Sequence, residues 1–180
     1  MIETSSTTRR GALVLTAGAM VAGCAIRPPA PRTKPAALTL EEAFVGRTVG
    51  KGVFSFPIAQ VNRRFRADLD GRLEGDRLTV VEDFFYEDGE TNRLTWVFDR
   101  AGPGRWTGRR EDTVGVAAVT EDNGLIRLEY LADVSSRGSV TRLGFRDLIY
   151  RTGPDVIVNE AVVSWNGLPL GSVRFEIRRA

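Results

Sequence analysis

Turn signals recur along most of this chain, and they limit it to a meander of antiparallel strands. They stand at Glu74-Gly75, Asp88-Gly89, Gly102-Pro103-Gly104, Asp122-Asn123-Gly124, Arg137-Gly138, Gly153-Pro154-Asp155 and Asn166-Gly167. The intervals are mostly about 14 residues, which is enough for a strand of about ten residues and a tight turn. One short helical pattern, at residues 39–44, precedes them, and no long segment has the 3.6-residue period of a helix.

Between the turns, polar and apolar residues alternate as they do in strands with one buried and one solvated face. In residues 61–70 the odd positions carry Val, Arg, Phe, Ala and Leu, whereas the even positions carry only Asn, Arg and Asp. We therefore predict about ten strands, near residues 47–56, 60–72, 76–87, 91–100, 104–110, 113–121, 124–135, 139–151, 155–165 and 168–178.

So many hairpin-linked strands with so little helix predict an all-β fold, an antiparallel up-and-down β-barrel with one short N-terminal helix. A flat sheet of this size would leave exposed edges and one bare apolar face. Eight strands just fill their interior with side chains or hold one small ligand, and ten leave more room. We therefore expect a ligand pocket inside the barrel.

The N-terminus has the composition of an export signal. Arg9-Arg10 precede a run of small and apolar residues at 11–22, which is too short to span a bilayer and fits the apolar region of a signal peptide. The segment around the two arginines resembles a twin-arginine signal, although Ala12 stands where a large apolar residue is usual. Export by the twin-arginine route and export by the general route both stay open.

Val21-Ala22-Gly23-Cys24 resembles a bacterial lipobox, in which the cysteine is lipidated and becomes the new N-terminus. A buried free thiol beside an ordinary cleavage site is the alternative, but it does not explain why the one cysteine ends the apolar run. Ala25 follows Cys24 where an aspartate would retain a lipoprotein in the inner membrane, so we expect a periplasm-facing protein on the outer membrane. The predicted segments are a signal peptide at 1–23, a lipidated Pro-rich tether at 24–37 and a single β-barrel domain at 38–180.

The residue inventory excludes several kinds of chemistry. The chain has no histidine, and its one cysteine is assigned to the lipid. This excludes Ser-His-Asp and Cys-His catalysis and metal sites built on imidazole or thiolate, and we expect no metal and no other cofactor. The net charge of +2 is spread along the chain without a run of five or six like charges, so nucleic acid is not an expected partner.

Turn geometry allows a strand register to be predicted. If Glu74-Gly75 is a two-residue loop, Ala67 faces Glu82 on the neighbouring strand. If residues 88–90 form a three-residue loop, Glu82 faces Trp96 in the next hairpin. Glu82 is then a carboxylate on an otherwise apolar inner face, where burial requires a partner or a proton.

We interpret Glu82 as a polar anchor at the base of a ligand cavity, with Arg63 and Tyr86 as its companions. A structural ion pair, or a solvated position near the barrel rim, accounts for the same pattern. The other candidate ligand-binding residues are polar or aromatic side chains within or beside apolar runs: Trp96, Asp112, Tyr130, Asp147, Tyr150 and Asn159. For the aromatic ones, core packing is the alternative.

Several motifs resemble those of the DUF3833 family of bacterial lipoproteins. They are Leu78-x-Val80-x-Glu82-x-Phe84-x-Tyr86-x-Asp88-Gly89, Arg93-x-x-Trp96, Gly102-x-Gly104-x-Trp106-x-Gly108, Asp112-x-Val114-Gly115-x-Ala117, Asp147-x-x-Tyr150, Asn159-x-Ala161 and Ser164-Trp165-Asn166-Gly167-x-x-x-Gly171. Glu160 and Trp165 depart from the pattern. The resemblance implies a lipocalin-like (calycin-type) barrel without established activity, in proteins associated with fatty-acid modification in the cell envelope.

Three functions fit these observations. The first is a membrane-tethered binding protein that holds a fatty-acyl chain or another apolar ligand as an accessory to envelope lipid modification, with a possible envelope protein as partner; it requires a hollow barrel. The second is a structural or assembly lipoprotein that acts through its outer surface. The third, ranked last, is an enzyme that uses Glu82, Asp112 or Asp147 with Tyr86 or Tyr150, and it requires a carboxylate of raised pKa in a cleft.

Overall fold

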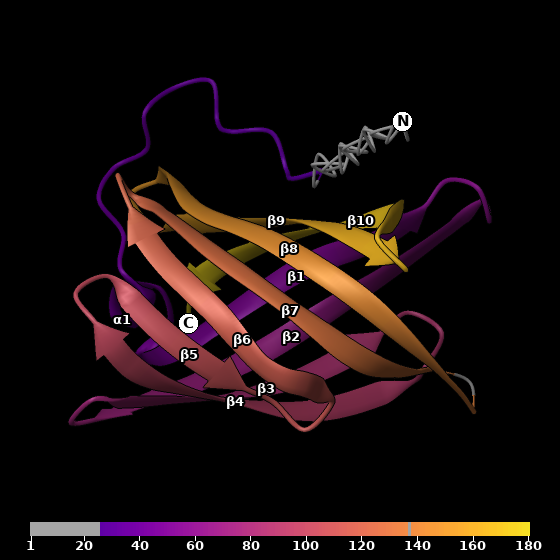
Figure 1. Cartoon of the computed structure of the whole chain (residues 1–180), viewed down its shortest axis with the longest axis horizontal. Coiled ribbons are helices and arrows are strands. Elements are labelled where there is room, and N and C mark those ends of the chain that lie inside the picture. The colour runs from indigo at the N-terminus through magenta and orange to yellow at the C-terminus, as the bar shows by residue number, and fades with distance from the viewer. Residues whose placement is uncertain (1–25, 137) are drawn as a thin grey trace, which may run out of the picture.

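The computed structural model describes residues 26–136 and 138–180, and within them one short helix precedes ten strands (Figure 1). The elements are α1 (Leu40–Phe44), β1 (Gly46–Phe56), β2 (Val61–Glu74), β3 (Arg77–Tyr86), β4 (Thr91–Gly102), β5 (Arg105–Arg109), β6 (Thr113–Asp122), β7 (Leu125–Ser136), β8 (Ser139–Gly153), β9 (Val156–Trp165) and β10 (Leu168–Arg179). Every predicted strand is present within about two residues of its expected ends. The predicted all-β class is confirmed.

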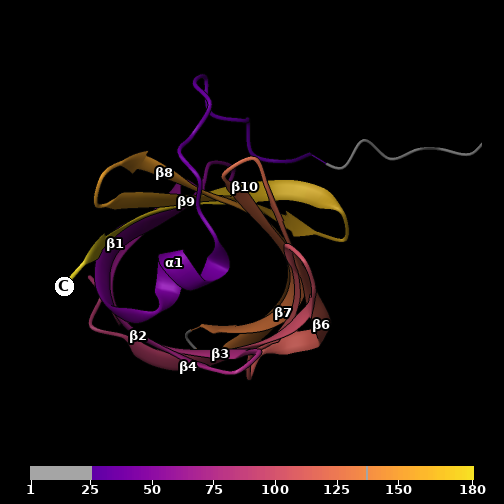
Figure 2. The ribbon, with the colours of Figure 1, turned by 90° about the vertical axis from the view of Figure 1, so that its left-hand side faces the viewer.

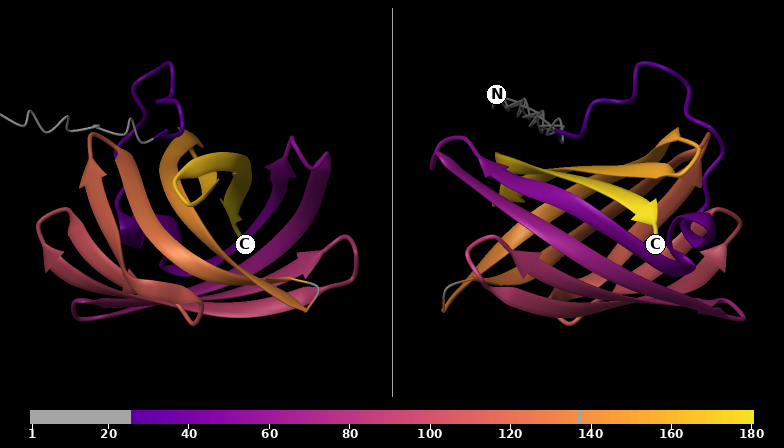
Figure 3. Two further views of the ribbon diagram at one scale, coloured as in Figure 1. Left: turned by 45° about the vertical axis from the view of Figure 1, so that its right-hand side comes forward. Right: turned by 180° about the vertical axis from the view of Figure 1, so that it is seen from behind.

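The strands form a closed antiparallel barrel in which each strand pairs with its neighbours in the chain and β1 pairs with β10. Figure 3 shows the strands winding obliquely around the barrel, as closure of a sheet requires. Alternate residues of each strand face the interior, and most of the large apolar side chains there belong to one buried core. The predicted lipocalin-like up-and-down barrel is therefore correct.

The predicted register between β2 and β3 is wrong by two residues, although the faces are right. Glu74 and Arg77 close the hairpin, so Glu82 faces Leu69 rather than Ala67. The reason is the turn. Gly75 has a φ of +59° and occupies the first of two loop positions, as in a type II′ turn, whereas the prediction placed this glycine second.

The register of the next hairpin is displaced in the same way. The amide of Tyr86 donates to the carbonyl of Glu90 at 2.9 Å, so the three-residue loop consists of residues 87–89. Gly89, with a φ of +85°, ends this loop in the left-handed conformation that such loops need. Glu82 therefore faces Leu94 rather than Trp96. A shift of two residues leaves every side chain on its predicted face.

Helix α1 closes one end of the barrel. Thr39 caps it with a complete capping box. The helix buries three of its own side chains, Leu40, Ala43 and Phe44. Figure 2 looks into this end and shows α1 within the ring of strands. Close packing depends on Gly71 in β2, where a Cβ atom would lie 1.8 Å from the carbonyl oxygen of Phe44.

Before α1, residues 26–39 contain neither helix nor strand and run along the outside of the barrel (Figure 1). Arg27 Nη2 lies 3.0 Å from Glu129 Oε1 on the outer face of β7. The predicted signal peptide and Cys24 lie outside the described residues, and the predicted domain boundaries stay predictions. Within the described residues, no helix has the length and apolar character needed to cross a membrane.

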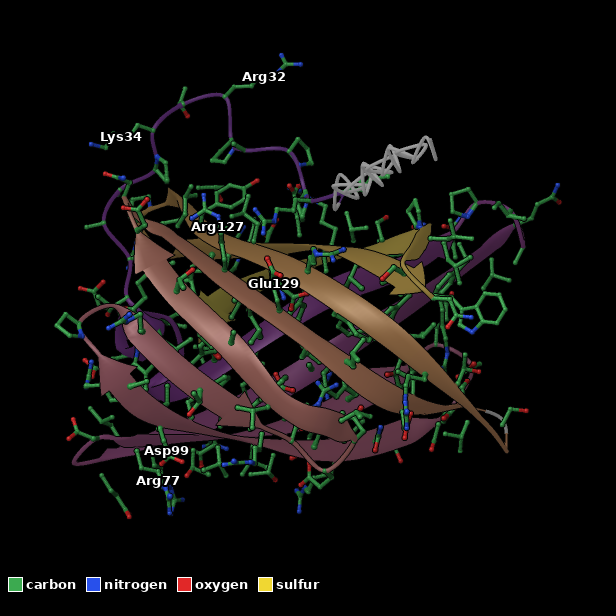
Figure 4. All side chains as sticks on the ribbon, in the orientation of Figure 1. Arg32, Lys34, Arg77, Asp99, Arg127 and Glu129 are labelled. Carbon is green, nitrogen blue, oxygen red and sulfur yellow. The ribbon has the colours of Figure 1, made fainter. Side chains whose placement is uncertain are left out.

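The outer face of the barrel carries charged pairs across neighbouring strands. Arg77 and Asp99 on β3 and β4 form such a pair, with 2.7 Å between Nε and Oδ1, and project outward in Figure 4. Exposed pairs of this kind contribute little to stability individually. Their position does confirm that the polar residues of the alternating pattern face solvent.

We predict that Gly71→Ala lowers the free energy of unfolding by about 2 kcal/mol or more, because the new methyl group meets backbone that no side-chain rotation can move. Urea unfolding followed by circular dichroism measures the effect. Gly153→Ala is the matched control, since a Cβ atom there would lie 3.7 Å from Val156, an ordinary van der Waals contact; its change should stay below about 1 kcal/mol. Equal urea midpoints for Gly71→Ala and the wild type would show that the close packing of α1 against Gly71 is not needed for stability.

Candidate ligand-binding site

The barrel encloses a cavity of about 570 Å³. Leu40 and Phe44 of α1 line its closed end, and Asn62, Asp88 and Ser136 line it at the hairpins of the opposite end. We call this opposite end the mouth. The large inner aromatic side chains stand along the walls and leave the centre hollow, so the requirement of the binding hypothesis is met.

One wall of the cavity is aromatic. The rings of Phe54 and Phe175 lie on either side of Phe65, each with 5.2 Å between ring centroids. Two glycines on the inner face of β1 make room for them. A Cβ at Gly52 would lie 2.3 Å from the ring of Phe65, and one at Gly50 would lie 2.4 Å from the ring of Phe175.

A buried ionic cluster projects from the opposite side. Arg110, which follows β5, makes two hydrogen bonds to Asp112: Nε to Oδ1 at 2.7 Å and Nη2 to Oδ2 at 3.0 Å. Its Nη1 lies 3.5 Å from Glu82 Oε2. The guanidinium also lies 4.9 Å from the ring centroid of Trp96 and 5.5 Å from that of Tyr130. Arg110 is thus enclosed by two carboxylates and two aromatic rings.

The predicted companions of Glu82 are therefore corrected. Arg63 lies at the mouth, where it pairs with Asp88 and Glu90 and stacks on Tyr86 at 3.6 Å from the ring centroid. The partner of Glu82 is Arg110, which the sequence interpretation missed. A solvated rim position for Glu82 is excluded, because only 8% of the residue is exposed.

A signal for Arg110 is present in the sequence. Trp106 and Gly108 face the interior from β5, and Arg110 continues the same alternation one step beyond the strand. The predicted strand at 104–110 ended at this residue, and Arg110 was not assigned to a face. Extending the inner-face pattern of Trp106 and Gly108 to the end of that predicted strand would have placed an arginine among the apolar side chains.

A second polar pair faces the cavity from β8 and β9. Asn159 Nδ2 donates to Asp147 Oδ2 at 3.2 Å. Asp147 is only 7% exposed. Among the described residues, three oxygens of the cavity wall are buried without a hydrogen-bond partner: Glu82 Oε2, Asp147 Oδ1 and Asn159 Oδ1. Buried polar atoms are normally satisfied, so these three require an explanation.

Burial raises the pKa of both carboxyl groups. For Glu82, loss of solvent outweighs the attraction of Arg110 and raises the pKa to about 7. For Asp147, loss of solvent outweighs the hydrogen bond from Asn159 and also raises the pKa to about 7. The third hypothesis required such a carboxylate in a cleft, and this condition is met as well.

The structure brings together nearly all the predicted ligand-binding residues. Those that line the cavity are Arg63, Glu82, Tyr86, Trp96, Asp112, Tyr130, Asp147 and Asn159. Tyr150 is the exception, and its assignment is wrong: it packs with Leu148 and Val158 on the outside of the barrel. On β8 the odd positions face inward, so Tyr150 has the opposite orientation to Asp147.

Fold and cavity together define a ten-stranded lipocalin-like barrel with an internal ligand-sized site. The chain belongs to the family described as "Protein of unknown function (DUF3833)", which it matches over residues 18–179. This confirms the resemblance inferred from the motifs. No curated protein matches the sequence.

Among solved structures, the chain is similar to the S-type phycobiliprotein lyase CPES from Guillardia theta, with a TM-score of 0.59. The match has 13% sequence identity and covers 79% of this chain and 93% of that chain. At this identity the likeness shows the shared barrel fold. It assigns no function to the residues of the cavity.

We predict that stability falls as pH rises from about 5 to about 7.5. Glu82 and Asp147 have folded-state pKa values of about 7, above their usual values near 4, so the folded protein binds more protons in this window. The free energy of unfolding therefore decreases with pH there, by about 3 kcal/mol for each group, and then levels off. Urea midpoints at pH 5, 6, 7 and 8 measure the slope.

The double variant Glu82→Gln, Asp147→Asn should flatten that slope, whereas Glu129→Gln on the outer face should keep it. The ion-paired Asp83, Asp99 and Asp133 have lowered pKa values and titrate below the window. A wild-type profile that is flat between pH 5 and pH 7.5 would show that the two acids are not buried as described.

Proposed function

We propose that this protein is a lipid-anchored binding protein of the cell envelope, which holds one fatty-acyl or similar apolar ligand as an accessory to lipid modification. The observation that carries the proposal is the cavity of about 570 Å³, with an aromatic wall and a small set of convergent polar groups. Small-molecule sites commonly have volumes of about 300–1,000 Å³ and this mixture of linings. Burial of each ligand methylene contributes about 0.8 kcal/mol to binding.

Exposed apolar side chains surround the mouth. They occupy the β1–β2, β7–β8 and β9–β10 hairpins: Ile58, Val140, Trp165 and Leu168, of which Ile58 is 85% exposed. Such side chains favour contact with lipid, and their position at the mouth supports exchange of an apolar ligand with a membrane. The similar structure is that of a phycobiliprotein lyase, and by fold analogy alone it is compatible with a ligand in the barrel.

If the cavity binds the ligand, a large side chain that fills the cavity should prevent ligand binding. Ala161 is buried on the inner face of β9 and lines the cavity, so Ala161→Phe should weaken binding of the neutral dye N-phenyl-1-naphthylamine by at least about tenfold. Ala118→Phe is the matched control, because Ala118 is exposed on the outer face of β6. Fluorescence titration of the complete chain carrying Cys24→Ser measures both. Equal affinities would place any dye site outside the barrel.

The anchor is a separate part of the proposal. We expect Cys24 to carry the lipid and the protein to face the periplasm from the outer membrane. In cells fed an alkyne-bearing fatty acid, the wild type should be labelled and should sediment with outer membranes. Cys24→Ser should be unlabelled and recovered in the soluble periplasmic fraction. Labelling of Cys24→Ser would refute lipidation at this residue.

Catalysis is the second candidate, favoured by one observation, the pKa of Glu82 near neutrality in an enclosed site. It requires turnover that Glu82→Gln abolishes while ligand affinity persists. Binding ranks above it because Arg110, the ion-pair partner of Glu82, is already engaged with Asp112.

A further inference from the structure

We infer that the polar end of the bound ligand is a hydrogen-bond donor, and specifically that the cavity selects an alkylammonium-type head group over a free carboxylate. This inference rests on the proposed binding function and names the chemistry of its ligand. It is carried by two buried acceptor oxygens without a hydrogen-bond donor, Asp147 Oδ1 and Asn159 Oδ1, and by Glu82 Oε2, which has only the ion pair with Arg110 Nη1 at 3.5 Å.

The three oxygens come from three different strands and line one cavity. Both carboxylates are more than nine-tenths buried, so bulk water does not satisfy them. An unsatisfied buried acceptor costs about 1–3 kcal/mol, and more when it is charged. A ligand that brings N–H or O–H groups to this place removes that cost, whereas a ligand that brings only acceptors does not.

The nitrogen donors beside these acceptors, on Arg110 and Asn159, are already used. Nε and Nη2 of Arg110 donate to Asp112, and its Nη1 faces Glu82. The Asn159 amide donates to Asp147, which fixes the orientation of the amide and leaves its oxygen without a donor. With Glu82 and Asp147 ionised, the acceptors of the deep site therefore outnumber its donors, of which the Tyr130 hydroxyl has no partner among the described hydrogen bonds.

The charges around Arg110 also favour a cationic head group over a carboxylate. One cation, Arg110, stands among the carboxyl groups of Glu82, Asp112 and Asp147. Glu82 is close enough to Asp147 to raise the pKa of that residue, and Asp112 and Glu111 raise the pKa of Glu82. A ligand carboxylate would add a further anion to this group, whereas an ammonium would neutralise one.

Among the described residues that line the mouth, the cation is not free to take a ligand carboxylate. This cation is Arg63, and its Nε and Nη2 donate to Asp88 and Glu90. A fatty acid bound with its carboxylate at the mouth would have to displace these two partners. Among the described residues, no three carboxylate, His or Cys side chains are placed so that they could hold one metal ion.

Three ligands with one chain length test the inference: dodecylamine, 1-dodecanol and dodecanoate, below their aggregation concentrations. Calorimetric titration into the complete chain carrying Cys24→Ser should give dodecylamine at least about tenfold higher affinity than dodecanoate at pH 8. Affinity for dodecylamine should rise between pH 6 and pH 8, because Glu82 and Asp147 lose protons in this range. Binding at pH 7 should release protons, which titration in two buffers of different ionisation enthalpy detects.

Glu82→Gln should lower dodecylamine affinity by about tenfold and reduce proton release, while 1-dodecanol affinity changes less than about threefold. Glu129→Gln, an outer-face carboxylate, should change neither. Dodecanoate binding as tightly as dodecylamine, or unchanged dodecylamine affinity in both Glu82→Gln and Asp147→Asn, would overturn the head-group inference and leave the binding function intact. If none of the three ligands binds, or if Ala161→Phe binds them all normally, the binding function itself fails. Near-UV circular dichroism verifies that each variant is folded.

Discussion

The pairing of β1 with β10 is the constraint on which the rest of this structure depends. It runs from Thr48 opposite Arg179 to Ser55 opposite Ser172 and turns a meander into a closed barrel. A closed barrel of ten strands has a diameter too large for its inner side chains alone to fill. Helix α1 occupies one end, and the aromatic wall, made possible by Gly50 and Gly52, occupies part of the middle. The cavity is what remains, so it follows from strand number and closure rather than from loose packing.

Stability alone does not account for the polar groups in that cavity. Replacing a buried ion pair by well-packed apolar residues is often neutral or stabilising, and breaking one by removing a partner is strongly destabilising. Glu82 and Asp147 both stay near their point of ionisation at neutral pH, which is costly for a core that only supports a fold. An apolar core would support the fold without this cost. A ligand that completes the hydrogen bonding of these groups would offset this cost.

Much of the fold was predictable, because alternation of side chains is a local property. Strand positions and faces were correct even where the register was wrong by two residues, since a shift of two preserves the face. The exact register depended on which loop position Gly75 and Gly89 occupy, and a dipeptide pattern does not specify this. The partnership of Glu82 with Arg110 was not predictable from the registers, because Arg110 lies in the turn after a short strand. The assignment of Tyr150 to the cavity was wrong for a simpler reason: the even-numbered positions of β8 face the outside of the barrel.

The two ends of the barrel differ, and this gives the site a direction. At the closed end, Glu121 accepts hydrogen bonds from the Leu40 amide and the Trp106 indole, which ties α1 to the wall. At the mouth, Phe54 and Tyr86 line the cavity beside exposed apolar hairpins. In the binding mode that we propose, a ligand held by its polar end at Glu82 and Asp147 extends its apolar part along the aromatic wall toward the mouth. Its chain, rather than its head group, is then the part that a membrane or a partner enzyme meets first.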